Sequence, residues 1–179
     1  MSYTLKELAA DIHRTLTEDR GASGKAAVCR LVSRAASDPD FVATHLRDRP
    51  AGAQPREILY EDPQLGFCIC GHVYDREAIG SPHDHGSSWA IYAQATGVTE
   101  MTDWKIVETG DGEKPTLVEP VRTYVMRPGD VHLYDVGMVH SPKREAAVKL
   151  IRIEGQNLDH MRRSKIKAAR ASARAGAGG

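Results

Sequence analysis

The sequence predicts a mainly β domain, a sandwich or small barrel, preceded by two or three α-helices. Near the N-terminus, apolar residues recur every three or four positions, as on one face of a helix. From about Arg56 to Ile153, short segments rich in Val, Ile, Tyr and Thr alternate with turn sequences. A length of 179 residues with 41% hydrophobic residues suits one globular domain with its own core.

Residues 1–50 are expected to form the helices, which pack on the barrel. The apolar spacing runs from Thr4 to about Ser37, and the sequence GASG separates two helical runs. In SDPDFVATHL, Asp38 is placed as an N-cap and Pro39 at the first helical position, which predicts a third helix. The prolines and glycine of RDRPAGAQP then mark a linker.

Residues 56–155 are expected to form the barrel. The strand-like segments are EILYE, GFCICGHVY, WAIYAQATGVTEMTDWKIVE, TLVEPVRTYVMR and AVKLIRIEG. Turn sequences such as DPQLG, TGDGEKP and RPGD separate them. Because no βαβ alternation or internal repeat is present, a sandwich or barrel is favoured over a parallel sheet.

Residues 156–179 form a basic tail. The whole chain has 24 basic and 24 acidic side chains, but Met161 to Gly179 holds six Lys or Arg residues and no acid. The alanines and glycines at its end predict a frayed helix that leads into disorder. A basic arm for nucleic acid is the alternative, and we expect no nucleic-acid partner.

We expect neither a membrane association nor a disulfide bond. Charges occur throughout the first 20 residues, and no run of about 18 apolar residues occurs in the chain, so we expect a cytoplasmic protein without a membrane partner. Cys68 and Cys70 lie two residues apart in GFCICG, where a bridge within a strand would be badly strained. We expect both to be reduced and buried.

Two segments carry the chemistry. In GSPHDHGSSWAIYAQATG, His83 and His85 are two positions apart, so in an extended strand both side chains lie on one face and can share a metal ion. About 55 residues later, in RPGDVHLYDVGMVHSP, His140 follows a PGD turn. The pair His83 and His85 is therefore a candidate metal site.

This pattern of a histidine pair followed by a third histidine after a PGD turn resembles the two motifs of the cupin superfamily. The resemblance implies a double-stranded β-helix barrel over about Arg56 to Glu154. It makes His83, His85 and His140 the three histidine ligands of a metal site, with His72 and His132 as outer-sphere groups or a fourth ligand. Gly97 matches the glycine that closes the first motif. The glutamate ligand of that motif falls on Ala90, or on Trp89 with the shorter spacing, and is therefore missing.

Three neutral imidazoles leave the charge of a cation uncompensated, which favours an anionic substrate or oxygen species. The site resembles the cysteine dioxygenase type of cupin. That resemblance implies a non-heme Fe(II) dioxygenase that uses O2 and a small anionic substrate, with a thiol such as cysteine or a related thiol carboxylate as a candidate. It places Arg56 near the arginine that pairs with the substrate carboxylate, with Arg122 and Arg152 as substitutes.

The chain departs from that type in the strand after the last ligand. A Ser-x-His-x-Tyr pattern is expected there, and the nearest segment, AVKLIRI, offers Lys149, Ile151 and Ile153. The substrate therefore stays open among thiols, β-diketones and hydroxy-aromatic acids. Imidazoles also bind Zn, Ni and Mn, so a hydrolytic or isomerising metal cupin, or a sensor without enzymatic activity, remains an alternative. A homodimer is also left open.

Two tyrosines are candidate catalytic groups. Tyr92 and Tyr124 fall on strand-like segments where a phenol near the metal can donate a proton. Tyr134 occupies a similar position. The alternative for each is a packed aromatic ring whose hydroxyl reaches the rim of the core.

Overall fold

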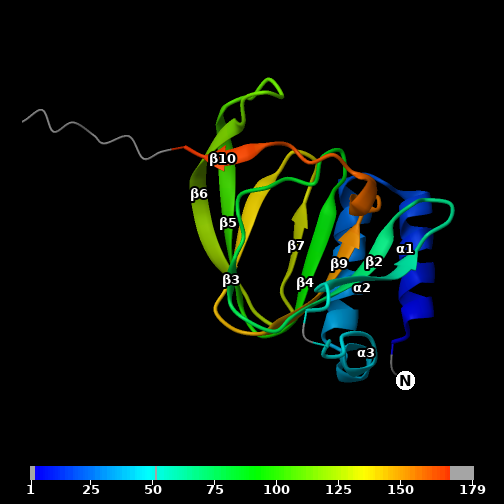
Figure 1. Ribbon diagram of the computed structural model, residues 1–179. Coiled ribbons are helices and arrows are strands. Elements are labelled where there is room, and N and C mark those ends of the chain that lie inside the picture. Colours follow the sequence, from blue (N-terminus) through cyan, green and yellow to red (C-terminus); the bar gives the residue numbers. More distant parts are fainter. Residues whose placement is uncertain (1–2, 51, 170–179) are drawn as a thin grey trace, which may run out of the picture.

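The computed structural model describes residues 3–50 and 52–169 (Figure 1). Its helices are α1 Leu5–Glu18, α2 Ala22–Ala36, α3 Pro39–His45 and the short 3-10 helix η1 Leu158–His160. Its strands are β1 Arg56–Glu61, β2 Cys68–Tyr74, β3 Ala78–Ile79, β4 Ala90–Thr96, β5 Thr99–Glu108, β6 Thr116–Met126, β7 Val131–Tyr134, β8 Val139–Arg144, β9 Val148–Glu154 and β10 Ile166–Ala168.

The strands form two five-stranded sheets, in the orders β1-β2-β9-β4-β7 and β10-β6-β5-β8-β3. The chain passes repeatedly from one sheet to the other, and Figure 1 shows the two sheets curled toward each other. This is the jelly-roll arrangement of a double-stranded β-helix. The predicted fold class, a cupin-type barrel preceded by α-helices, is confirmed.

The first and third helices begin where the sequence predicts. Thr4 forms a capping box with Glu7 at the start of α1. The Asp38 side chain accepts hydrogen bonds from the backbone N–H groups of Asp40 and Phe41, at 2.9 and 3.2 Å, and so caps α3. The predicted connector GASG is shorter than expected, because α2 already begins at Ala22.

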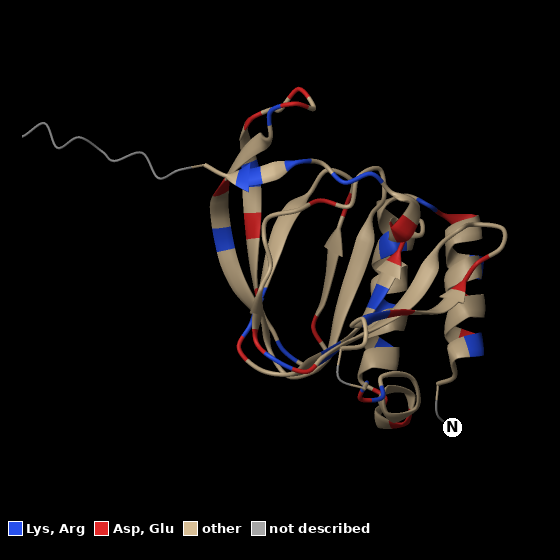
Figure 2. Ribbon diagram, in the orientation of Figure 1, with Lys and Arg blue, Asp and Glu red and all other residues tan. Residues whose placement is uncertain are grey.

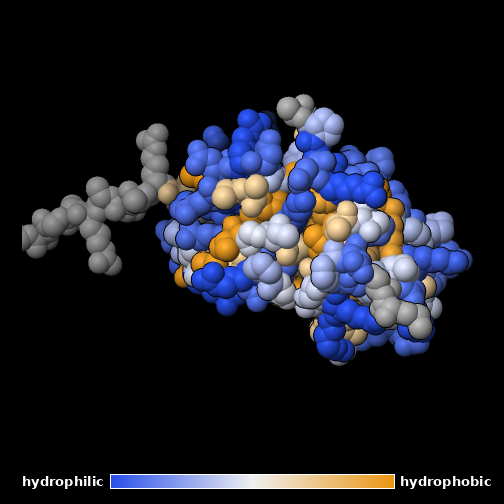
Figure 3. Space-filling model, turned by 90° about the horizontal axis from the view of Figure 1, so that it is seen from below, coloured by the Kyte–Doolittle hydropathy of each residue, from blue (hydrophilic) through white to orange (hydrophobic). Residues whose placement is uncertain are grey.

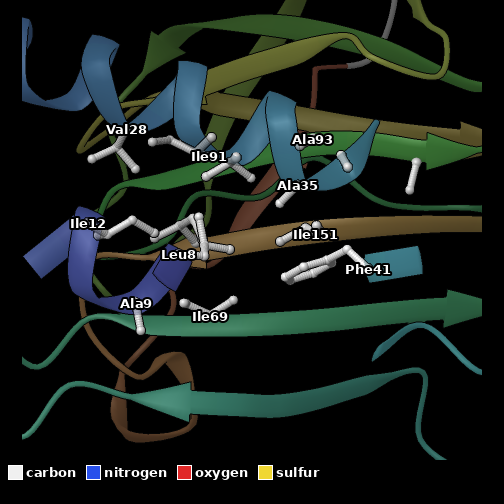
Figure 4. Packing of buried hydrophobic residues seen from close by; sticks show 14 of the residues in the cluster. Leu8, Ala9, Ile12, Val28, Ala35, Phe41, Ile69, Ile91, Ala93 and Ile151 are labelled. Atoms are coloured by element: carbon white, nitrogen blue, oxygen red, sulfur yellow. The ribbon is translucent and has the colours of Figure 1, made fainter. Parts of the chain in front are cut away.

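The main apolar core lies between the helices and the sheet that contains β2, β9 and β4 (Figure 4). Leu8 and Ile12 of α1 and Val28 of α2 pack in one buried cluster with Ile91 of β4 and Ile151 of β9. Side chains of a strand alternate between its two faces. Since the odd-numbered residues of β9 face the helices, its even-numbered residues face the barrel interior.

The basic tail differs from the expected helix. Within the described part of the tail, η1 is followed by β10, which pairs in parallel with β6. Ile166 lies opposite Thr116, whose backbone N–H donates to the carbonyl of Lys165 at 2.8 Å. The exposed edge of β6 offers backbone groups that an extended segment can pair with, which outweighs local helix propensity. Residues 170–179 lie outside the described residues.

The surface carries charges of both signs, and Lys and Arg colour part of β10 (Figure 2). Seen from below, exposed apolar residues gather along the middle of the face, with hydrophilic residues around them (Figure 3). No helix among the described residues is long and apolar enough to cross a membrane. Cys68 and Cys70 are free and buried, as predicted, and burial raises the pKa of each thiol to about 12.

Candidate metal centre

The three predicted ligands come together at one end of β8. His140 belongs to β8, whereas His83 and His85 lie in the segment before β4. That segment is not the continuous strand that we expected. It touches β8 through a single antiparallel bridge, in which the backbone groups of His83 and His140 exchange hydrogen bonds of 3.0 Å. Pro82 before the histidine pair has no N–H to donate to a ladder, and Gly86 after the pair turns the chain with a φ of +62°.

The histidine rings are close enough to share an ion. One ligand atom from each of His83, His85 and His140 lies within 4.8 Å of the others. The ring centroids of His83 and His140 are 4.5 Å apart, and those of His85 and His140 are 4.8 Å apart. His83 lies only partly buried at this site, whereas His85 and His140 are buried.

Burial keeps the rings in the form that binds metals. Desolvation lowers the pKa of His83, lowers that of His85 to about 3 and lowers that of His140 well below its usual value. The charge of Arg152 adds to the shift at His85. At neutral pH the imidazoles are therefore neutral, and each has a lone pair for a metal ion.

Some ring nitrogens of this cluster have no hydrogen-bond partner among the described residues. Nδ1 of His83 lies 2.9 Å from the carbonyl oxygen of Ser81, which leaves its Nε2 for the site. Nδ1 of His85 and Nδ1 of His140 are buried without a hydrogen-bond partner among the described residues. Unsatisfied buried nitrogens in a cluster of neutral imidazoles fit a site that an ion or water completes.

Ala90 takes the position at which the sequence motif would place a glutamate ligand. Ala90, the first residue of β4, is fully buried and lies opposite Tyr134 of β7 and Glu154 of β9. The Glu154 carboxylate, although its residue pairs with Ala90 in the sheet, is held by two arginines and is not part of the three-histidine cluster. No carboxylate among the described residues joins the cluster.

Arg56, the expected carboxylate clamp, is occupied by acidic side chains. Its Nε and Nη2 donate to the two oxygens of Glu154 at 3.0 and 2.7 Å, and its Nη1 donates to Asp159 at 2.7 Å. Burial alone would raise the pKa of Glu154, but the hydrogen bonds from Arg56 and the charge of Arg152 outweigh it and hold the pKa at about 2. Glu154 is therefore ionised and paired at neutral pH.

Tyr92 lies at the centre of the site. Its hydroxyl is 3.1 Å from Nε2 of His85 and 3.4 Å from Nε2 of His140. Nη1 of Arg152 donates to the same hydroxyl at 3.2 Å, and Nη2 of Arg152 donates to Glu154. Burial raises the pKa of Tyr92 although Arg152 lowers it, so the phenol keeps its proton at neutral pH.

Tyr124, the other predicted catalytic tyrosine, is separated from the histidines by Tyr134. The ring of Tyr134 stacks on His140 with centroids 3.7 Å apart, and its hydroxyl lies 2.6 Å from that of Tyr124. The Tyr124 hydroxyl also donates to Asp103 at 3.2 Å. Burial raises the pKa of both phenols. Tyr124 is thus placed to act through Tyr134.

The outer histidines and Arg122 lie apart from the cluster. His132 lies near Tyr124, with ring centroids 4.5 Å apart, and near Arg122, whose Nη2 is 3.4 Å from its Nε2. Nε of Arg122 donates to Asp103 at 2.7 Å. Nδ1 of His72 lies 3.1 Å from the hydroxyl of Tyr74. Neither histidine belongs to the three-histidine group.

A cavity of about 250 Å³ in the barrel interior reaches the cluster. It is lined by His83 and Tyr92 and by four arginines, Arg56, Arg144, Arg152 and Arg163. Sequence reasoning missed Arg144 and Glu154. Their signal was the alternation along β8 and β9, since Arg144 shares the face of His140, and Glu154 shares the face of Arg152.

No protein-family model matches the chain, and no curated protein matches it. Similar solved structures include a cupin superfamily protein from Desulfitobacterium hafniense, with 10% identity and a TM-score of 0.43, over 60% of this chain and 81% of that one. KdgF from Halomonas sp. has 18% identity and a TM-score of 0.43, over 60% and 84% of the two chains. The DMSP lyase DddQ from Ruegeria pomeroyi has 12% identity and a TM-score of 0.44, over 60% and 49%. These neighbours are too distant to indicate an activity, and the fold assignment rests on the strand topology.

Proposed function

We propose that this protein is a metal-dependent dioxygenase that uses non-heme Fe(II) and O2 to oxidise a small anionic molecule. The observation that carries the proposal is the cluster of three neutral histidines, without a carboxylate, beside a cavity lined by arginines. A cation held by neutral ligands keeps its full charge, which favours anionic partners. Thiol carboxylates such as cysteine are the first candidates for the substrate.

His83, His85 and His140 would hold the metal through their imidazole nitrogens. Ferrous iron, when bound, supplies electrons for the reduction of dioxygen, which zinc cannot supply because it has no redox chemistry. The metal site faces the cavity on the side of His83, whose ring is only partly buried. A small molecule in the cavity therefore lies next to the ligands.

Tyr92 is the candidate proton donor. Its protonated hydroxyl lies within 3.4 Å of two ligand nitrogens and also lines the cavity. Arg152 fixes the phenol from the other side through its 3.2 Å hydrogen bond. The hydroxyl is therefore held where it can give a proton to an oxygen atom of a substrate in the cavity.

Oxygen uptake by anaerobically loaded protein tests the proposal. We expect iron-loaded protein to consume oxygen when it is given one of a panel of small thiols, β-diketones and hydroxy-aromatic acids. The same protein loaded with zinc should consume none, because zinc cannot change its oxidation state. Hydrolysis of an ester or amide by zinc-loaded protein, together with no oxygen uptake, would replace the dioxygenase with a hydrolase.

Tyr92→Phe is the matched variant for the role of the phenol. The ring stays, so metal content should equal that of the parent, whereas substrate-dependent uptake should fall about a hundredfold, as for the loss of a general acid. Tyr60→Phe removes a hydroxyl on β1 that contacts Asp62 and serves as the control. If Tyr92→Phe consumed oxygen as fast as the parent does, Tyr92 would not be the proton donor.

A further inference from the structure

The charged side chains in the wall of the inner cavity, the one of about 250 Å³, are all cationic. Besides apolar and neutral polar residues, its described lining has four arginines and no aspartate or glutamate. Two of the arginines, Arg56 and Arg152, donate to Glu154, and Arg56 also pairs with Asp159. Arg163 lies on the exposed segment that follows η1. Arg144 is the buried arginine whose charge is not balanced in this way.

Arg144 is buried and unpaired. The residue is 8% exposed, yet its side chain forms no hydrogen bond or ion pair with any described residue, and its Nε is buried without a partner. A buried guanidinium without a counterion is costly unless a ligand supplies the negative charge. A cluster of donors that nothing in the described chain satisfies therefore points to a bound anion.

The guanidinium of Arg144 is also held in place. It lies over the ring of Tyr74 on β2, with its central carbon 3.8 Å from the ring centroid. Such stacking fixes the plane of the guanidinium and leaves its edge free to donate hydrogen bonds. The hydroxyl of Tyr74 lies near Nδ1 of His72, whose Nε2 is a second buried nitrogen without a partner among the described residues.

Arg144 and one of the proposed ligands, His83, line the same cavity. Arg144 lies four residues after His140 on β8, so the two side chains point to the same face and their Cα atoms are about 13 Å apart along the strand. Arg144 and Tyr74 also line an outer cavity of about 630 Å³ beside β3. The stacked pair therefore stands between the outer cavity and the space next to the histidines.

We propose that Arg144, held by Tyr74, is the carboxylate-binding residue of the cavity and that the substrate is a small carboxylic acid whose reactive end reaches the histidines. The location of the reactive end rests on the proposed function, but the carboxylate site does not depend on a metal. The planar edge of a guanidinium pairs with both oxygens of a carboxylate. The cavity volume, below the roughly 300 Å³ at which most ligand pockets begin, limits the substrate to a small molecule.

Calorimetric titration of metal-free, full-length protein with propionate and benzoate tests this site. We expect at least one of these carboxylates to bind the parent, and the matched amides, propionamide and benzamide, not to bind. Arg144→Gln should weaken carboxylate binding at least tenfold, because a hydrogen bond to a charged group contributes about 1.5 kcal/mol or more and 1.4 kcal/mol is a factor of ten. Arg144→Lys should bind carboxylates with intermediate affinity, because lysine keeps the positive charge but lacks the two parallel N–H donors of the guanidinium.

Arg14→Gln, which removes an exposed positive charge on α1, is the matched control and should bind carboxylates like the parent. The proposal would be overturned if Arg144→Gln bound carboxylates as tightly as the parent does. It would also be overturned if the parent bound the amides, or if the parent bound neither carboxylate. Tighter binding of inorganic phosphate than of either carboxylate would overturn the carboxylate assignment. Loss of binding in Arg56→Gln alone would assign the role to Arg56.

Two measurements keep the result interpretable. Circular dichroism shows whether Arg144→Gln is folded, and the metal content of the reloaded variant shows whether the histidine site is intact. Since binding is measured without metal, a failure of the oxygen-uptake test leaves the carboxylate site standing. A failure of carboxylate binding likewise leaves the metal site standing.

Discussion

Glu154 has no exposed surface, and its ionised carboxylate is paired with Arg56 and Arg152. Through Arg152 the carboxylate also reaches the hydroxyl of Tyr92 next to the histidines. Removing one partner of such a buried network leaves a charge without compensation. The arginine that the sequence resemblance assigns to substrate binding therefore has a structural role as well.

Arg56→Gln should lower the free energy of unfolding by about 3 kcal/mol or more, because Glu154 loses its bidentate partner inside the protein. Urea denaturation measures the change. Arg49→Gln is the matched control, because Arg49 pairs with the exposed Glu57. This substitution should lower the free energy of unfolding by less than about 1 kcal/mol. Equal costs for the two variants would contradict the structural role of the pair.

Single residues were predictable where chemistry and spacing are local. The spacing of His83 and His85, together with the sequence resemblance that adds His140, predicted three histidines that the fold does bring together. Neither Arg56 with Glu154 nor Arg144 with Tyr74 could be paired in the same way. Each pair joins strands that are distant in the sequence, and only the tertiary fold brings their side chains together.

The orientation of β9 changes which residues should be compared with the thiol dioxygenase pattern, but neither face of the strand carries that pattern. We compared that pattern with Lys149, Ile151 and Ile153, but Ile151 and Ile153 belong to the core beneath the helices. The interior face presents Arg152 and Glu154 instead. A shift of one residue moves every side chain of a strand to the other face. Because β9 has apolar residues on both faces, its sequence alone does not show which face is turned toward the barrel interior.

The turn between β4 and β5 depends on Gly97. Its φ is +70°, and a Cβ at this position would lie 2.6 Å from the backbone carbonyl oxygen of Ala147. A left-handed conformation costs other residues about 1–2 kcal/mol, and a backbone atom cannot move aside as a flexible side chain does. Glycine is thus required at this position both because the φ is positive and because a Cβ would clash with the backbone.

Gly97→Ala should lower the free energy of unfolding by more than about 2 kcal/mol, which combines the backbone strain with the clash. Gly112→Ala is the matched control, because Gly112 also has a positive φ, of 93°, but has open space around its Cβ position. Its cost should stay near 1 kcal/mol. Thermal denaturation of both variants would contradict this account if the two melting temperatures fell equally.

Across the whole molecule, the predicted order of helices, linker and barrel is the order of the described chain. Composition and periodicity were sufficient for this, because apolar residues had to be buried between helices and sheet. The tail was not predictable, because β10 forms on the edge that β6 offers and not through its own propensity. The histidine segment is likewise extended by a single bridge to β8 and not by its own sequence.

The fold also divides the barrel into two environments. One sheet is covered by the helices and buries the apolar cluster, while the interior between the sheets holds the histidines, the tyrosines and the arginines. This polar interior is the reason why neutral imidazoles and cationic guanidinium groups face a common cavity. We infer that this interior contains a metal centre formed by His83, His85 and His140.

Elemental analysis of the purified protein shows whether this metal centre exists. We predict about one first-row metal ion per chain in the parent, and loss of that metal in each of His83→Ala, His85→Ala and His140→Ala, because every ligand of a three-histidine site is needed. His72→Ala and His132→Ala should keep the metal, since neither belongs to the cluster. Full metal content in any one of the three ligand variants, with loss in His72→Ala or His132→Ala, would contradict the assignment.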